Sequence, residues 1–128
     1  MTVLLDTHVL LWFQGLDRRL STDVRNRIET GPERYFVSQI SLWEIAIKHS
    51  IGKLPLDRDL STTFAKVEEA GFEILSLRTK HIVEVSTLPL HHRDPFDRML
   101  IAQAKAEGMQ LLTVDPHFKL YDVPLLDL

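Results

Sequence analysis

The chain has 128 residues, 45% of them hydrophobic and 26% charged, which is the size and composition of one globular domain covering residues 1–128. Its 15 Lys and Arg against 18 Asp and Glu give a net charge of −3, which excludes a polycation that coats nucleic acid non-specifically. It contains no cysteine, no basic export signal at its amino terminus and no apolar run of membrane-spanning length, so we expect a cytoplasmic protein.

Strand-like and helix-like segments alternate along the chain. Short aliphatic runs bounded by polar or turn residues predict buried strands at residues 2–5, 35–37, 73–77, 111–114 and 123–126. Helical periodicity and capping residues predict helices at residues 7–14, 21–29, 41–51, 61–70, 79–87 and 95–107. This order predicts an α/β fold in which a central parallel sheet of about five strands is flanked by helices on both faces. In such a sheet the strands end at one edge, where ligands bind.

Two aspartates follow predicted strands and are therefore expected at that edge. Asp6 follows the strand at residues 2–5, and Asp115 follows the strand at residues 111–114. Each also has a structural explanation, because Asp is a favoured N-cap and Pro116 suits the first position of a helix or turn. The sequence alone leaves both interpretations open.

Glu44 lies near the start of the predicted helix at residues 41–51. Ser41 as the N-cap and Glu44 three residues later would form a capping box. Helical spacing also places Glu44 on the same stripe as Ile40 and Ile47, which turns its carboxylate toward the apolar side of the helix. A charge in that position requires a cation.

The segment at residues 91–99 carries two more candidate acids. Asp94 can cap the helix that Pro95 opens, and it can pair with Arg98 one turn later. Asp97 heads an apolar stripe and is expected to face inward in the first turn of the same helix. Its structural explanation is the favourable interaction of an acid with the helix dipole.

The structural explanations do not require these acids to gather at one edge of one sheet. Carboxylates that lie close together repel and raise one another's pKa, a cost that a divalent cation removes. Oxygen ligands without cysteine favour a hard ion, and Mg²⁺ or Mn²⁺ fits best. Since no Ser, Cys or His is arranged as an activated pair, we expect water to be the nucleophile at such a site.

Four short segments carry a resemblance to a known family. They are residues 4–8 (LLDTH), 41–48 (SLWEIAIK), 94–102 (DPFDRMLIA) and 113–115 (TVD). Any one of them is a weak pattern, but together, in this order and spacing, they span nearly the whole chain. In this combination the sequence resembles the PIN-domain ribonucleases, in particular the VapC-type toxins of bacterial and archaeal toxin–antitoxin pairs.

The resemblance implies a PIN-like fold with an acidic pocket in which Asp6, Glu44, Asp97 and Asp115 bind Mg²⁺ or Mn²⁺. Asp94 would be an auxiliary catalytic residue close by. Asp97 is favoured over Asp94 as the ligand because it precedes the Arg-Met-Leu-Ile-Ala run that aligns with the family's usual third acid. The resemblance further implies a metal-dependent endoribonuclease that leaves 5′-phosphate and 3′-hydroxyl ends, forms a homodimer and is inhibited by a cognate antitoxin protein.

Two other functions remain open at this point. A phosphatase that forms an aspartyl-phosphate usually has a second Asp two residues after the first, where this chain has His8. A catalytically idle protein-interaction module would use the same acids only as helix caps. Metal dependence of the melting temperature would separate an idle module from a metal site, because a bound ion stabilises the folded state.

Several residues around the acids receive structural interpretations. His91 and His92 are not expected to bind metal, since adjacent imidazoles point in different directions on most backbones. Trp12 and Trp43 are expected in the core or in a dimer interface. Basic residues near the acidic segments could contact phosphates around the pocket; these are Lys48, Lys53, Arg93, Arg98 and Lys119.

Overall fold

The computed structural model describes residues 1–126 and contains a four-stranded parallel sheet of order β3-β2-β1-β4. The strands are β1 (Thr2–Leu5), β2 (Arg34–Ser38), β3 (Glu73–Leu75) and β4 (Gln110–Leu112). The helices are α1 (Thr7–Gln14), α2 (Thr22–Thr30), α3 (Gln39–Ser50), α4 (Leu60–Glu69), α5 (Thr79–Ser86), α6 (Pro95–Glu107) and the 3-10 helix η1 (Pro116–Leu120). Within residues 1–126, no helix is both long enough and apolar enough to cross a membrane.

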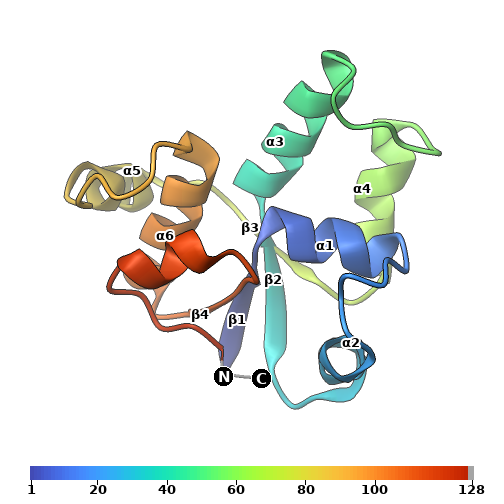
Figure 1. The fold of residues 1–128 in the computed structure, drawn as a ribbon, viewed down its shortest axis with the longest axis horizontal. Coiled ribbons are helices and arrows are strands. Elements are labelled where there is room, and N and C mark those ends of the chain that lie inside the picture. Colours follow the sequence, from blue (N-terminus) through green and yellow to red (C-terminus); the bar gives the residue numbers. More distant parts are fainter. Residues whose placement is uncertain (127–128) are drawn as a thin grey trace.

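The sheet separates two hydrophobic cores, as the alternation of side chains along a strand requires. In β1, Val3 and Leu5 join one core while Leu4 joins the other. The first core lies under α1, α2 and α4, and the second lies under α5, α6 and η1, so helices cover both faces of the sheet (Figure 1). This confirms the predicted α/β fold with a parallel sheet flanked by helices.

The predicted fifth strand, at residues 123–126, makes only an isolated parallel bridge between Leu125 and Leu111. Leu126 N–H donates to Leu111 O at 3.0 Å, and Leu111 N–H donates to Pro124 O at 2.9 Å. Pro124 has no N–H of its own, so the segment cannot continue a regular ladder. The sheet therefore has four strands and one additional bridge, close to the five strands expected.

The start of α3 differs from the prediction. Ser38, the last residue of β2, is the N-cap, and its Oγ accepts a hydrogen bond from Ile40 N–H at 3.0 Å. The predicted capping box of Ser41 and Glu44 is therefore wrong, since Ser41 Oγ accepts a hydrogen bond from Thr7 Oγ1 instead, at 2.8 Å. β2 passes into α3 without a loop, and this brings α3 directly to the carboxyl edge of the sheet.

Candidate metal-binding active site

Asp6 lies between β1 and α1, at the carboxyl edge of the sheet. Its backbone N–H donates to Leu112 O at 2.9 Å, which ties it to β4. The residue is 1% exposed and its side chain makes no capping bond to α1. Instead Thr113 Oγ1 donates to Asp6 Oδ2 at 2.9 Å and holds the carboxylate toward the end of β4. Asp6 therefore occupies the predicted N-cap position of α1, but its side chain makes no capping hydrogen bond.

Glu44 lies on α3 and is buried, with 2% of its surface exposed. The inward orientation predicted from its stripe is confirmed. Its cation is Lys48, one turn later, whose Nζ lies 2.5 Å from Glu44 Oε2. Although burial disfavours the Lys48 ammonium, the hydrogen bond and negative charge of Glu44 raise its pKa, so Lys48 stays charged.

Two buried carboxylate oxygens have no hydrogen-bond partner among residues 1–126. They are Asp6 Oδ1 and Glu44 Oε1, one on each of the two most buried acids of the site. A buried polar group without a partner costs roughly 1 to 3 kcal/mol, and more when it is charged. A hard cation is the partner that carboxylate oxygens favour in such a place. The residues therefore fit a divalent metal ion.

Asp94 and Asp97 lie at the start of α6. Asp94 Oδ1 caps the helix by accepting from Phe96 N–H at 2.8 Å and Asp97 N–H at 3.0 Å. Asp97 is 9% exposed, and its Oδ2 lies 2.9 Å from His92 Nε2. One potential ligand atom from each of His92, Asp94 and Asp97 lies within 4.8 Å of the other two. These residues form a second group of potential ligands.

The two groups of acids influence one another through their charges. Burial, together with the charges of Asp94, Asp6 and Glu44, raises the pKa of Asp97 to about 6, against the opposing hydrogen bond with His92. Burial also raises the pKa of Asp6, with a further contribution from the charge of Glu44, while the bond from Thr113 opposes it. The predicted gathering of carboxylates thus includes Asp6, Glu44, Asp94 and Asp97.

The raised pKa of Asp97 predicts an opposite pH dependence with and without metal. Without metal, the stability that protonated Asp97 contributes is present below pH 4 and is lost as pH rises through about 6. Metal binding requires the ionised carboxylate, so stabilisation by Mn²⁺ should increase over the same range. Melting temperatures from pH 4.5 to 7.5, in EDTA and in Mn²⁺, measure both trends. In the Asp97→Asn variant both pH trends should become weaker. Unchanged curves would show that the pH dependence comes from other groups.

Asp94 offers a test that separates capping from metal binding. Asp94→Asn keeps a competent N-cap and should change the free energy of unfolding little, whereas Asp94→Ala should lower it by about 1 kcal/mol. Urea denaturation measures both variants. A loss of Mn²⁺ affinity in the asparagine variant would make Asp94 a ligand, and an unchanged affinity would restrict it to capping.

Asp115 is connected to this group through two histidines. It caps η1, since its Oδ1 accepts from His117 N–H at 2.9 Å and lies 2.8 Å from His117 Nδ1. Partial burial disfavours its charged form, but the hydrogen bonds with His117 outweigh this effect and lower the pKa of Asp115. The His117 ring stacks on His92 at 4.6 Å between centroids, and His92 in turn contacts Asp97. The capping interpretation of Asp115 is confirmed, and the residue also borders the site.

Sequence reasoning missed three features of this site. His92 lies in the loop before α6, where no periodicity marks its direction, and its ring contacts Asp97. Arg98 does not form the expected pair with Asp94, because its guanidinium donates to Pro89 O at 2.9 Å and Tyr121 Oη at 3.1 Å. The contact of His117 with Asp115 was also missed. The sequence held a weak signal for it, because His117 follows Asp115-Pro116, a dipeptide typical of a capped turn.

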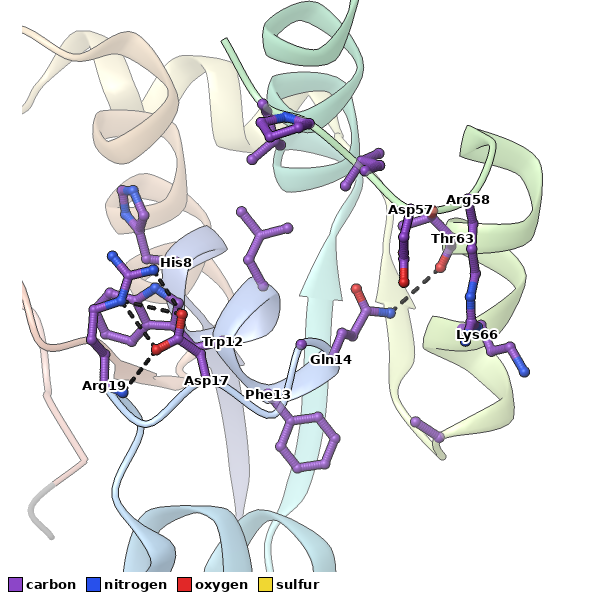
Figure 2. A pocket seen from close by; sticks show the side chains of 16 residues that line it. His8, Trp12, Phe13, Gln14, Asp17, Arg19, Asp57, Arg58, Thr63 and Lys66 are labelled. Atoms are coloured by element: carbon purple, nitrogen blue, oxygen red, sulfur yellow. Dashed lines mark hydrogen bonds and ion pairs between the residues drawn. The ribbon is translucent and has the colours of Figure 1, made fainter.

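A groove of about 720 Å³ lies beside the acidic site, between α1, α4 and the segment at residues 54–58. Figure 2 shows His8, Trp12 and Arg19 at one end and Arg58 and Lys66 at the other. Arg19 lies over the Trp12 ring at 4.9 Å. His8 lines the groove and follows Asp6 by two residues, so it links the groove with the acids. Trp12 is partly buried against the first core, as expected, and its ring also lines this groove.

Trp43 is not a core residue, since 58% of it is exposed. Its ring meets Phe96 edge-on with 5.2 Å between centroids. Both rings lie one residue before an acid of the site, Glu44 and Asp97 respectively. The expectation that Trp43 packs in the core is therefore wrong, while its place in a dimer interface stays a prediction.

Comparison with solved structures shows the same fold. VapBC2 of Rickettsia felis, bound to a promoter DNA fragment, matches with a TM-score of 0.73 and 16% identity, over 99% of this chain and 98% of that one. DNA-bound VapBC of Salmonella typhimurium matches with a TM-score of 0.71 and 17% identity, over 99% and 97%. VapBC-1 of nontypeable Haemophilus influenzae matches with a TM-score of 0.63 and 15% identity, over 99% and 98%. At these identities the likeness concerns the fold.

The fold and the site define an α/β protein with a carboxylate pocket at the carboxyl edge of a parallel sheet. The family profile of the PIN domain matches residues 3–124. The chain therefore belongs to the PIN-domain family. A search of curated protein sequences gave no match.

Proposed function

We propose that this chain is a Mg²⁺- or Mn²⁺-dependent endoribonuclease and the toxin of a toxin–antitoxin pair. The observation that carries the proposal is the pair of unpartnered buried oxygens, Asp6 Oδ1 and Glu44 Oε1. Acids that served only as caps or in ion pairs would have these oxygens bonded or exposed to water. Membership in the PIN-domain family supports phosphodiester hydrolysis as the reaction.

The proposed metal ligands are Asp6, Glu44, Asp97 and Asp115, with Asp94 as an auxiliary residue. When bound, the ion supplies Lewis-acid chemistry, lowering the pKa of water and offsetting the negative charge of a phosphodiester. Thr113 orients Asp6, and His92 holds one oxygen of Asp97. The hydrogen bond between His117 and Asp115 keeps Asp115 ionised.

Lys48 is the cationic residue of this proposed site. Its ammonium neutralises one oxygen of Glu44, and its charge also interacts with Asp94 and Asp97. Because Lys48 is partly exposed, it lies where a phosphate of the RNA backbone can reach it. The protein as a whole has a net charge of −3, so this local contact matters for RNA binding.

The proposed partner is a cognate antitoxin protein. The structures that this chain resembles in fold are VapBC complexes, two of them bound to DNA. A small DNA-binding protein encoded next to this chain would support the toxin assignment. The proposal includes a cytoplasmic location, where such a pair acts on cellular RNA.

A homodimer is also part of the proposal. Helix α5 exposes Ile82 and Val83, 51% and 61% respectively, and these apolar side chains are available for contact with a second chain. Sedimentation equilibrium measures the oligomeric state directly. A monomer at micromolar concentration would contradict this part of the proposal and leave the nuclease assignment standing.

The experiment that tests the function combines binding with cleavage. In EDTA-treated protein, millimolar Mg²⁺ or Mn²⁺ should raise the melting temperature by mass action and should start cleavage of RNA with 5′-phosphate products. No shift and no cleavage would favour the idle interaction module. Hydrolysis of a phosphate monoester with an untouched RNA chain would favour the phosphatase, although His8 occupies the position where that class carries its second Asp.

A further inference from the structure

A chain of buried hydrogen bonds joins the start of α3 to α6 and α5. Ser38, Gln103 and His81 are each 0% exposed. Ser38 Oγ accepts from Ile40 N–H at 3.0 Å and donates to Gln103 Oε1 at 2.5 Å. Gln103 Nε2 lies 3.2 Å from His81 Nδ1. Because these groups have no access to water, each depends on its neighbour in the chain for its hydrogen bond.

The donors and acceptors of this network allow one arrangement. Arg78 backbone N–H donates to His81 Nδ1 at 3.0 Å, so this nitrogen carries no proton. The proton is on His81 Nε2, which donates to Glu107 Oε2 at 2.7 Å. The Gln103 amide must then give its N–H to His81 and its oxygen to Ser38, since the reverse orientation sets two acceptors against each other. The bonds thus run in one direction, from Ile40 to Glu107.

The network stands at a fixed distance from the acidic site. Glu44 follows Ser38 by six residues along α3, and Gln103 follows Asp97 by six residues along α6. With a rise of about 1.5 Å per residue, each interval spans about 9 Å. Ser38 bonds to Gln103, and the Trp43 ring, next to Glu44, meets the Phe96 ring, next to Asp97, with 5.2 Å between centroids. The two helices therefore run in opposite directions with two matched points of interaction.

The two points act on the helices in opposite ways. At the acidic point, Glu44 and Asp97 both carry carboxylates, and like charges brought close together repel. At the other point, the bond from Ser38 to Gln103 fixes their spacing, and His81 fixes the orientation of the Gln103 amide. Apolar contacts between the helices do not set a register so closely, because they lack direction.

We propose that His81 and Gln103 are positioning residues that set the spacing of α3 and α6 and thereby hold Glu44 and Asp97 close enough to share one cation. The inference rests on the metal-dependent function proposed above. His81 and Gln103 do not touch the acids; they act through Ser38 and the two helices. Their loss should therefore weaken metal binding, in addition to any effect on stability.

Two substitutions of His81 separate positioning from simple support of the fold. In His81→Asn the amide oxygen replaces Nδ1 and can still accept from Gln103 and Arg78, whereas the bond to Glu107 is lost. In His81→Gln the amide nitrogen replaces Nε2 and can still donate to Glu107, whereas the acceptor for Gln103 is lost. Mn²⁺ titration calorimetry on EDTA-treated protein is the measurement, with the metal-free melting temperature recorded alongside.

We expect His81→Asn to bind Mn²⁺ nearly as tightly as the unsubstituted chain and His81→Gln to bind about tenfold more weakly, the lower end of the loss seen when residues that orient metal ligands are replaced. Gln103→Met, of similar length but without hydrogen-bonding groups, should resemble His81→Gln. It also supplies the test if His81→Gln does not fold, as circular dichroism would show.

Equal Mn²⁺ affinity in all variants, with only the metal-free melting temperature lowered, would overturn the inference and restrict the network to stability. Weaker binding in His81→Asn than in His81→Gln would overturn it too, because the bond to Glu107 would then be the important one. An unsubstituted chain that binds no Mn²⁺ would instead contradict the proposed function itself.

Discussion

Asp6→Asn should lower metal-dependent RNA cleavage by at least about a hundredfold, since residues that only orient metal ligands already contribute 10- to 100-fold. Asp6 carries one of the two unpartnered buried carboxylate oxygens, and its backbone N–H donates to Leu112 O at the junction of β1 and β4. Asparagine has the shape of aspartate and keeps an oxygen for the Thr113 hydroxyl. The loss should therefore come from the missing charge, with the fold unchanged.

The metal-free stability of this variant should change in the opposite direction. Burial raises the pKa of Asp6, which means that the folded chain holds the ionised carboxylate at a cost. At pH 7 in EDTA, Asp6→Asn should melt at the same temperature as the unsubstituted chain or higher, and Mn²⁺ should no longer raise it. Thermal melts with and without Mn²⁺ test both statements.

Asp23→Asn provides a matched control, because Asp23 is an exposed aspartate on α2 and its substitution makes the same change in charge. It should cleave RNA at the normal rate. The same comparison applies to Glu44→Gln, Asp97→Asn and Asp115→Asn. Near-normal cleavage by any one of these variants would remove that residue from the proposed ligand set.

Those parts of the fold that depend on local sequence patterns were predictable. The helices at residues 7–14 and 95–107 have the predicted bounds, since Pro95 and Gly108 mark the ends of the second one. The burial of Glu44 was predictable because helical spacing places it on the apolar stripe of Ile40 and Ile47. The start of α3 was not predictable in this way, because Ser38 and Ser41 are equivalent caps in sequence and only the contact of Ser41 with Thr7 separates them.

The placement of the acids at the sheet edge was predictable, whereas the contacts that hold their side chains were not. Acids next to strand ends gather because parallel strands end at one edge, which is a property of the topology. The contacts of His92 with Asp97 and of Thr113 with Asp6 depend on how loops fold across the sheet. Thr113 and Asp6 are 107 residues apart, a separation over which no periodicity connects them.

The second large effect expected concerns the antitoxin, for which we predict that the acids are also a binding site. A pocket of several carboxylates, in which Lys48 pairs with one oxygen of Glu44, attracts a basic side chain from another protein. We predict that an arginine of the antitoxin enters the pocket and competes with metal for Asp6, Glu44, Asp97 and Asp115. Arginine is favoured over lysine because its planar fork bonds carboxylates bidentately.

Competition of this kind makes inhibition reversible and sensitive to metal. Raising Mg²⁺ or Mn²⁺ should weaken the antitoxin, and Asp6→Asn combined with Asp97→Asn should raise its Kd at least about thirtyfold, because removing the partner of a buried charge costs about 2 to 5 kcal/mol. The measurement is titration calorimetry of the protein encoded beside this chain against the unsubstituted chain and against the double variant. An antitoxin affinity that changes neither with metal nor with the double substitution would contradict this prediction. The inhibitory contact would then lie in the groove around Trp12, where a helix or strand of the antitoxin would bury Leu54 and Leu56 and apolar burial would supply the affinity.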